Sequence, residues 1–141
     1  MPQFLAAVLL MVAASVPAAT AEESWPDLTG VWSGEAPAVV RGNPLHHQLT
    51  EPSDEVRISN LVITVTVEGQ EGRNFWGTVA SPHATESLVG AIAADRMSLH
   101  FVSTVGYTRA VLLEPDMMEV CYLQASAEMQ VAVCRTMTRE D

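Results

Sequence analysis

Short apolar-alternating segments, separated by turn residues, fill most of this chain. In the clearest of them, Leu61, Ile63, Val65 and Val67 alternate with positions that are mostly polar. A period of two is typical of a strand with one face on a core and one face toward water. Seven such segments follow one another from residue 61, and an eighth lies near the front. The predicted strands cover residues 29–40, 61–68, 73–80, 86–93, 96–103, 107–113, 117–123 and 129–139.

The spacing of these segments predicts an all-β fold. Consecutive strands joined by short turns form an antiparallel meander, and eight of them can close into an up-and-down β-barrel. A two-sheet β-sandwich of the same strands is the alternative. Gly77 and Gly90 fall on inward positions in mid-strand, where glycine permits the sharp bends of a barrel. Pro37 indicates a break or an edge position in the first strand, and residues 41–57 have no period and indicate a long functional or mobile loop.

The first residues have the pattern of a secretory signal peptide. An apolar run from Leu5 to Ala14 is followed by the small-x-small site Ala19-Thr20-Ala21, although no Lys or Arg precedes the run. The alternative is a membrane anchor, but the run is shorter than the ~20 apolar residues that span a bilayer. We therefore expect a signal peptide over residues 1–21, a single domain over residues 22–141, and a secreted or periplasmic location.

The charge of the chain is strongly acidic and narrows the classes of partner. The formal net charge is −10, and all seven cations are arginines. A negative field repels phosphate backbones and anionic lipid surfaces, so we expect neither nucleic-acid binding nor membrane binding after removal of the leader. Solubility, or adaptation to a saline habitat, explains the acidic composition more simply than a recognition surface does.

Cys121 and Cys134 are the two cysteines, and the predicted last hairpin places them opposite each other. If the final two strands turn at residues 126–128, the numbers of paired residues sum to 255, which aligns Cys121 with Cys134. Directly opposite positions bring Cβ atoms close enough for a disulfide, and disulfides persist in exported proteins. Two buried thiols are the alternative. No CxxC motif supports a metal site at these residues.

The start and end of the predicted barrel resemble the calycin superfamily, which includes lipocalins, fatty-acid-binding proteins and avidins. Gly30-Val31-Trp32 is similar to the GxW signature of that superfamily, and the segment around it resembles the start of an avidin-type barrel. Residues 75–79 resemble the F-x-G-T segment of the avidin third strand. The resemblance implies that Arg139 packs across the ring of Trp32.

An up-and-down meander supports the same pairing of Trp32 and Arg139. The first and last strands are antiparallel neighbours, so a residue early in one lies near a residue late in the other. A guanidinium over an indole is a favourable cation–π contact and would have a structural role here. The alternative for Arg139 is a solvated charge near the chain end. No tryptophan follows Trp76, whereas avidins hold biotin with tryptophans of later strands, so the chain is not expected to bind biotin.

No catalytic motif is recognisable in the chain. His46 and His47 are adjacent in the long loop, where they could contribute to a metal site or, as the simpler interpretation, remain solvated. A tetrahedral zinc site needs three or four ligands, which the spacing does not supply. No Ser/His/Asp or Cys/His arrangement has supporting context, so we expect a protein that is not an enzyme and has no resident metal or cofactor.

Alternation places a few polar side chains inside the predicted barrel. They are Tyr107, Arg109, Tyr122 and Arg135. A buried arginine is costly unless it is paired or solvated, so these residues predict a cavity with water or an anionic ligand group. A register slip or bulge that turns Arg109 and Arg135 outward is the alternative.

Two functions from different classes fit these observations. The first is an exported barrel that binds one small, partly apolar molecule in its mouth, with Tyr107, Arg109, Tyr122 and Arg135 as candidate contacts. The second is a filled barrel that acts on a protein partner through its surface, as a secreted protease inhibitor or an envelope interaction module. An open cavity would favour the first function, and a packed interior would favour the second.

Overall fold

The structure is a computed structural model that describes residues 24–141, so the signal peptide expected at residues 1–21 lies outside the described residues. The described part holds eight strands and one short 3-10 helix. The strands are β1 (Gly30–Arg41), β2 (Arg57–Glu71), β3 (Asn74–Ala80), β4 (Thr85–Ile92), β5 (Ser98–Val102), β6 (Tyr107–Glu114), β7 (Met117–Ala125) and β8 (Gln130–Arg139). The 3-10 helix, η1 (Leu45–His47), lies between β1 and β2.

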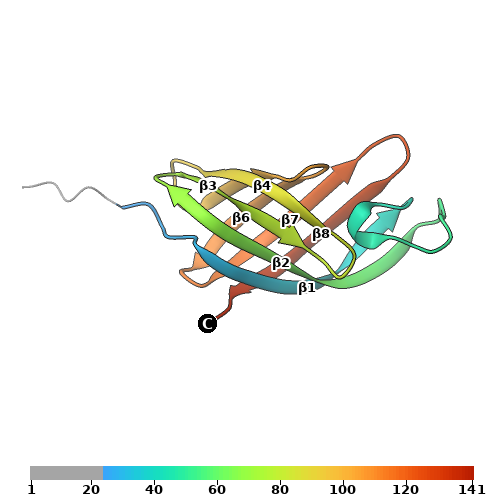
Figure 1. Ribbon diagram of the computed structural model, residues 1–141, viewed down its shortest axis with the longest axis horizontal. Coiled ribbons are helices and arrows are strands. Elements are labelled where there is room, and N and C mark those ends of the chain that lie inside the picture. Colours follow the sequence, from blue (N-terminus) through green and yellow to red (C-terminus); the bar gives the residue numbers. More distant parts are fainter. Residues whose placement is uncertain (1–23) are drawn as a thin grey trace, which may run out of the picture.

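The eight strands close into one antiparallel barrel (Figure 1). Each strand pairs with the next one along the chain, and β8 pairs with β1 to complete the circle. The up-and-down barrel predicted from the alternation is therefore confirmed, and the sandwich alternative is excluded for the described residues. β2 is longer than its predicted segment because it continues to pair with β1 as far as Arg57.

Pro37 neither breaks β1 nor marks an edge of the sheet. Pro37 pairs with Asn60 of β2, and the strand continues to Arg41. The register between β1 and β8 has a gap from Ser33 to Val39, which includes the proline. Because Pro37 has no backbone N–H to donate, it fits the stretch of β1 where the ladder to β8 is interrupted.

Inward side chains of all eight strands pack into a continuous core. The larger core cluster contains Trp32, Leu88, Leu99 and other apolar residues, together with an edge-to-face pair of Phe75 and Phe101 with ring centroids 5.8 Å apart. Gly90 lies between these two rings: a Cβ atom there would come within 2.3 Å of Phe75 and 2.6 Å of Phe101. The absence of a side chain at Gly90 therefore makes room for the aromatic pair.

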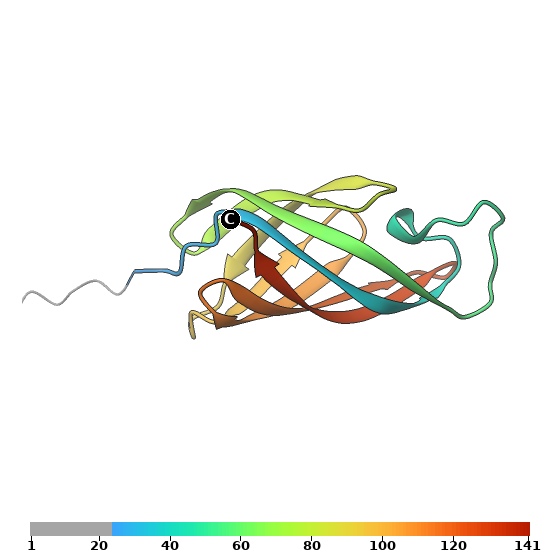
Figure 2. The ribbon, with the colours of Figure 1, turned by 90° about the horizontal axis from the view of Figure 1, so that it is seen from below.

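Trp32 and Arg139 close one end of the barrel as expected. Trp32 is fully buried, and its indole nitrogen donates a hydrogen bond of 2.9 Å to the carbonyl oxygen of Leu28. The guanidinium carbon of Arg139 lies 4.4 Å from the centroid of the Trp32 ring, and Arg139 pairs with Trp32 in the register of β1 and β8. Figure 2 shows the C-terminus beside the start of β1. The alternative of a solvated terminal charge is therefore wrong.

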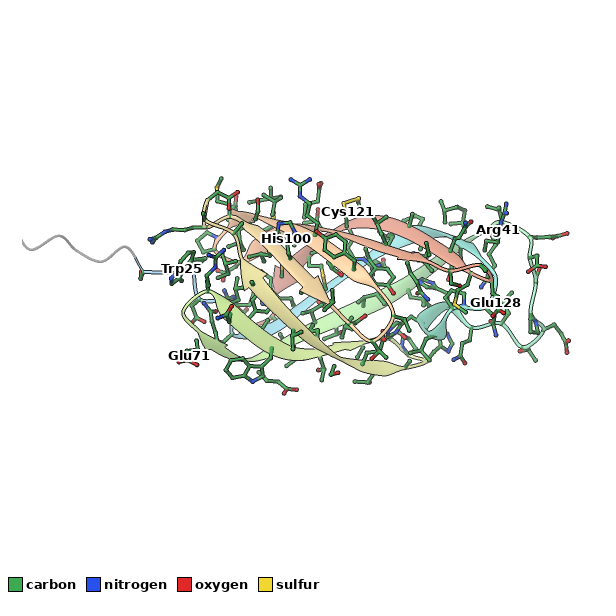
Figure 3. All side chains as sticks on the ribbon, turned by 90° about the horizontal axis from the view of Figure 1, so that it is seen from above. Trp25, Arg41, Glu71, His100, Cys121 and Glu128 are labelled. Carbon is green, nitrogen blue, oxygen red and sulfur yellow. A yellow bond between two sulfur atoms is a disulfide. The ribbon has the colours of Figure 1, made fainter. Side chains whose placement is uncertain are left out.

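The β7–β8 hairpin has the predicted register and carries the predicted disulfide. Cys121 is bonded to Cys134, and the flanking pair of Glu119 with Thr136 follows the same sum of 255. The two cysteine Cα atoms are 4.0 Å apart, as suits the narrow kind of antiparallel pair. The disulfide lies on the outer wall of the barrel (Figure 3).

The long connection between β1 and β2 covers the other end of the barrel. Figures 1 and 2 show η1 and its flanking loop at the end opposite the C-terminus. Arg57 fastens this connection, because its guanidinium donates hydrogen bonds to the carbonyl oxygens of Gly42 at 2.7 Å and His47 at 2.6 Å. The connection is thus partly ordered by η1 rather than free of structure.

Candidate functional site

A small cavity lies inside the barrel beneath η1. Its volume is about 40 Å³, enough for a few water molecules and far below the ~300–1,000 Å³ of a site for a drug-sized ligand. Apolar side chains from five strands form most of its wall, and polar side chains gather at the η1 end. The lining residues are His46, His47, Ile63, Val65, Val79, Glu86, Phe101, Ser103, Thr108, Val120, Tyr122, Arg135 and Met137.

The two histidines of η1 form the cover of this cavity. His46 is held from both ring nitrogens: Nε2 lies 2.6 Å from Oε2 of Glu86, and Nδ1 lies 2.8 Å from Oγ of Ser81. Nδ1 of His47 lies 2.8 Å from Oγ of Ser59 on β2. Both rings are buried, at 7% and 5% exposure, so the interpretation as solvated loop histidines is wrong. Sequence reasoning missed this because their partners lie far along the chain, on β2, on β4 and in the turn after β3.

Three buried polar atoms at this cavity lack a hydrogen-bond partner within residues 24–141. They are Oε1 of Glu86, Oγ of Ser103 and Nη1 of Arg135. Buried polar groups in folded proteins are nearly always hydrogen-bonded, so unpaired groups gathered on one cavity call for an explanation such as a bound polar molecule or water. The cavity can therefore offer both hydrogen-bond donors and a hydrogen-bond acceptor to a bound ligand.

Arg135 is the most unusual of these groups. It points inward from β8 between Val133 and Met137, and only 7% of its surface is exposed. No carboxylate in the described part of the chain lies within the 4 Å of an ion pair with it. Burial lowers the pKa of its guanidinium from the ordinary value. An arginine stays charged even so, which leaves an uncompensated positive charge at the cavity wall.

Burial shifts the pKa values of two other residues that line the cavity, His47 and Tyr122. Burial, followed by the positive charge of Arg135, lowers the pKa of His47 to about 4, so this imidazole is neutral at pH 7. Burial, followed by the negative charge of Glu86, raises the pKa of Tyr122 to about 12. The Tyr122 hydroxyl donates a hydrogen bond of 2.9 Å to Oε1 of Gln124.

Gly106 makes room for the Tyr122 ring at the cavity. A Cβ atom at Gly106 would come within 2.1 Å of the ring carbons of Tyr122. The turn between β5 and β6 can therefore pass over the tyrosine only with glycine at this position. The ring is held against the wall that it shares with Arg135.

Two of the four predicted contact residues lie inside the barrel, and two do not. Tyr122 and Arg135 line the cavity, whereas Tyr107 and Arg109 are exposed on the outer face of β6. Their expected inward orientation is wrong because the inward positions of β6 are Thr108 and Ala110. The neighbours in register explain why: Phe101 and Tyr122 flank Thr108, and Leu99 and Val120 flank Ala110. These large inward side chains leave space only for small ones on β6.

Glu86 is the site residue that sequence reasoning missed although the pattern contained a signal. It shares the inward phase of Leu88, Gly90 and Ile92 on β4. An acidic side chain in phase with a core face indicates a buried polar partner, which here is His46. Ser103 gave no such signal, since it lies in the turn after β5.

Two further classes of site are absent from the described residues. No three His, Cys, Asp or Glu side chains come together there as ligands for a metal ion. None of the helices in residues 24–141 has the length and apolar character that would let it cross a bilayer.

Comparisons with known proteins do not assign the chain to a family. No family model and no curated protein matches it. One match among solved structures is the S-type phycobiliprotein lyase CPES from Guillardia theta, with 12% identity over 81% of this chain and 89% of that chain and a TM-score of 0.31. That TM-score is too low to carry an argument, so the fold rests on the strand pairing described above, and the calycin resemblance stays an expectation.

Proposed function

We propose that this barrel binds a small, partly apolar molecule through an anionic group that pairs with Arg135. The observation that carries the proposal is the unpaired, buried guanidinium at a cavity whose other walls are mostly apolar. A carboxylate placed there would supply the missing counter-charge and accept charge-assisted hydrogen bonds. The hydroxyl of Ser103 is a second donor for the same group.

The size of the cavity limits how such a ligand binds. About 40 Å³ accepts a carboxylate head group but not a long apolar tail. A tail would therefore extend toward the mouth, and η1 would move aside because His46 and His47 cover the cavity there. Polar contacts to Ser59, Ser81 and Glu86 hold this cover, and such contacts can be exchanged for water when it opens.

A thermal-shift series with straight-chain carboxylates from acetate to hexanoate tests the proposal. At about 10 mM, a carboxylate with a Kd near 1 mM stabilises the protein by ~1.4 kcal/mol, or roughly 5 °C. We expect this shift for a carboxylate and not for the alcohol or amide of the same length. The shift should vanish in Arg135→Met and persist in the matched control Arg109→Met, which alters an exposed arginine. Equal shifts with the alcohols, or an unchanged shift in Arg135→Met, would refute the proposal.

We also propose that the site binds its ligand without turnover. Ser81, His46 and Glu86 are joined by contacts of 2.8 and 2.6 Å in the order of a hydrolase triad. However, the Ser81 oxygen accepts the backbone N–H groups of His83 and Ala84, and Ser81 does not line the cavity. These contacts support a role in fastening η1. Hydrolysis of 4-nitrophenyl acetate should be the same with the wild type and Ser81→Ala; a loss of turnover in the variant would contradict this.

The proposed setting for binding is outside the cytoplasm. The apolar leader with its small-x-small site and the Cys121–Cys134 disulfide support export, since disulfides persist in oxidising compartments. N-terminal sequencing of protein recovered from the periplasm or medium of its host should find a start near Glu22. Retention of Met1 would count against export.

A filled barrel that acts through its surface is the second candidate, because the cavity is small. Native mass spectrometry of protein purified from its own host separates the two candidates. A retained small acid supports binding in the barrel, and its absence together with a flat thermal-shift series supports surface action.

A further inference from the structure

A continuous row of exposed apolar side chains crosses the outer face of all eight strands. We name it the apolar belt, and its members lie directly opposite one another in the strand register. In order around the barrel they are Ile58, Val39, Ala132, Leu123, Tyr107, Val102, Val89 and Trp76. The seven large side chains among them are between 42% and 64% exposed. Single exposed apolar residues are ordinary on a protein surface, whereas a contiguous row marks an interaction site.

Acidic side chains are absent from the belt itself and rare in the rows beside it. The row on one side consists of Asn74, Ala91, His100, Arg109, Cys121 and Cys134. The residues in register on the other side are Thr78 with Ser87, and Ala125 with Gln130 and Arg41. None of these is Asp or Glu, although the chain has 17 acidic residues. Two exposed acids lie on β2 at the Trp76 end of the belt: Glu71 pairs with Asn74, and Glu68 lies in the bulge opposite Trp76 and Gly77. The belt is therefore a neutral to weakly basic band on a molecule of net charge −10.

The part of the belt on β3–β6 has the properties of an interface centre. Trp76, Val89, Val102 and Tyr107 line a shallow surface groove together with Ala91 and His100. The Tyr107 hydroxyl lies 2.6 Å from Nδ1 of His100, and the two rings stack at 6.1 Å, which fixes the orientation of the tyrosine. Tryptophan and tyrosine are enriched at interfaces, and an anchor held in place before binding loses less entropy. Figure 3 shows His100 and Cys121 on this outer wall.

The distribution of charge favours a second copy of this chain as the partner that binds the belt. Two copies of a −10 molecule repel each other wherever carboxylates face carboxylates, and the acid-free belt removes that conflict. A two-fold interface must be self-complementary, so charges at the rim of an apolar patch have to occur in both signs. Arg109 lies in the row beside the belt, and Glu119 lies two residues from Cys121 along the same face of β7. A closed barrel has no free strand edge, so the contact has to use side chains.

We propose that the belt on β3–β6 is the contact surface of a homodimer. Four strands at a spacing of ~4.8 Å make this face only ~15–20 Å wide. A patch of that width buries less surface area than a standard protein–protein interface does. We therefore expect a reversible dimer with a Kd of roughly 100 µM. The dimer does not depend on the proposed ligand, because the belt is on the outer wall and the cavity is inside.

Sedimentation equilibrium over about 2–500 µM tests the dimer. The weight-average mass of the wild type should rise about 1.7-fold at the highest concentration if the Kd is near 100 µM. Raising the salt concentration from about 0.02 to 0.15 M should strengthen the dimer, because screening weakens the repulsion between the acidic copies. Val89→Glu should stay monomeric throughout.

Val62→Glu is the matched control. Val62 is also an outward valine, 51% exposed, but lies on β2 outside the belt. This variant should dimerise like the wild type, with circular dichroism confirming the fold of both variants. Trp76→Arg replaces Val89→Glu if the latter does not fold. A wild type that stays monomeric at about 500 µM would overturn the proposal. Equal loss of dimer formation in Val62→Glu and Val89→Glu would overturn it as well.

Discussion

Removal of the Trp32–Arg139 contact should expose how the barrel is held closed. Trp32 is fully buried, so Trp32→Ala removes a large aromatic side chain and leaves the Leu28 carbonyl without its indole donor. Loss of a buried aromatic costs ~3–5 kcal/mol, and we expect the upper half of that range because of the lost hydrogen bond.

Arg139 fastens three segments of the chain at once. Besides covering the indole, its guanidinium donates hydrogen bonds to the carbonyl oxygens of Thr29, Asp27 and Pro115, and its Nε lies 3.0 Å from a carboxylate oxygen of Asp116. Asp116 is mostly exposed, so that ion pair contributes little. The carbonyl contacts and the cation–π contact together make Arg139→Ala cost ~2–3 kcal/mol.

A double-mutant cycle measured by urea unfolding tests the coupling of the two residues. The coupling free energy should be ~1–2 kcal/mol, because Arg139 loses its ring partner in Trp32→Ala. Trp32→Phe keeps a ring under the guanidinium and should retain part of the coupling. Leu123→Ala on the outer wall, combined with Arg139→Ala, is the control for additivity. Additive losses for Trp32 and Arg139 would show that the observed contact does not stabilise the closure.

Three further predictions concern the site and the hairpin. Arg135→Met should raise the free energy of unfolding of the ligand-free protein by ~1–3 kcal/mol in urea, because it removes an uncompensated buried charge; a destabilised variant would show that the guanidinium is well paired. The pKa of His47 is about 4 in the folded protein, against 6.5 for an ordinary histidine. Its contribution to the free energy of unfolding is therefore complete above pH 6.5 and is lost as the pH falls toward 4. The urea midpoint should fall over that window, and His47→Gln should flatten the profile whereas His83→Gln should not. Replacing Cys121 and Cys134 by alanine should cost up to ~3 kcal/mol, given their separation of 13 residues, and a change within the error of the melting temperature would contradict this.

Local patterns along the chain were sufficient for much of the fold. The alternation in residues 61–68 and its repeats predicted the strands, because every second side chain of a strand with one buried face points to the core and is apolar. The turn at residues 126–128 set the β7–β8 register and with it the Cys121–Cys134 pair. The positions of Trp32 and Arg139 at opposite ends of the meander predicted their contact.

The candidate site depended on contacts that no local pattern contains. β6 has polar side chains in both phases, so its alternation could not decide between Arg109 and Thr108 as the inward residue. The large inward side chains of β5 and β7 decided it, because the interior has a fixed volume and accepts only small side chains on β6.

The sequence by itself therefore determined the strands, their order and the two pairings that follow from strand register. Only the tertiary structure decided which side chains close the η1 end of the barrel. His46 and His47 are buried there because Glu86, Ser81 and Ser59 supply hydrogen-bond partners for their rings. Periodicity reports which face of a strand is buried, whereas a polar partner from a distant strand is set by barrel closure and packing.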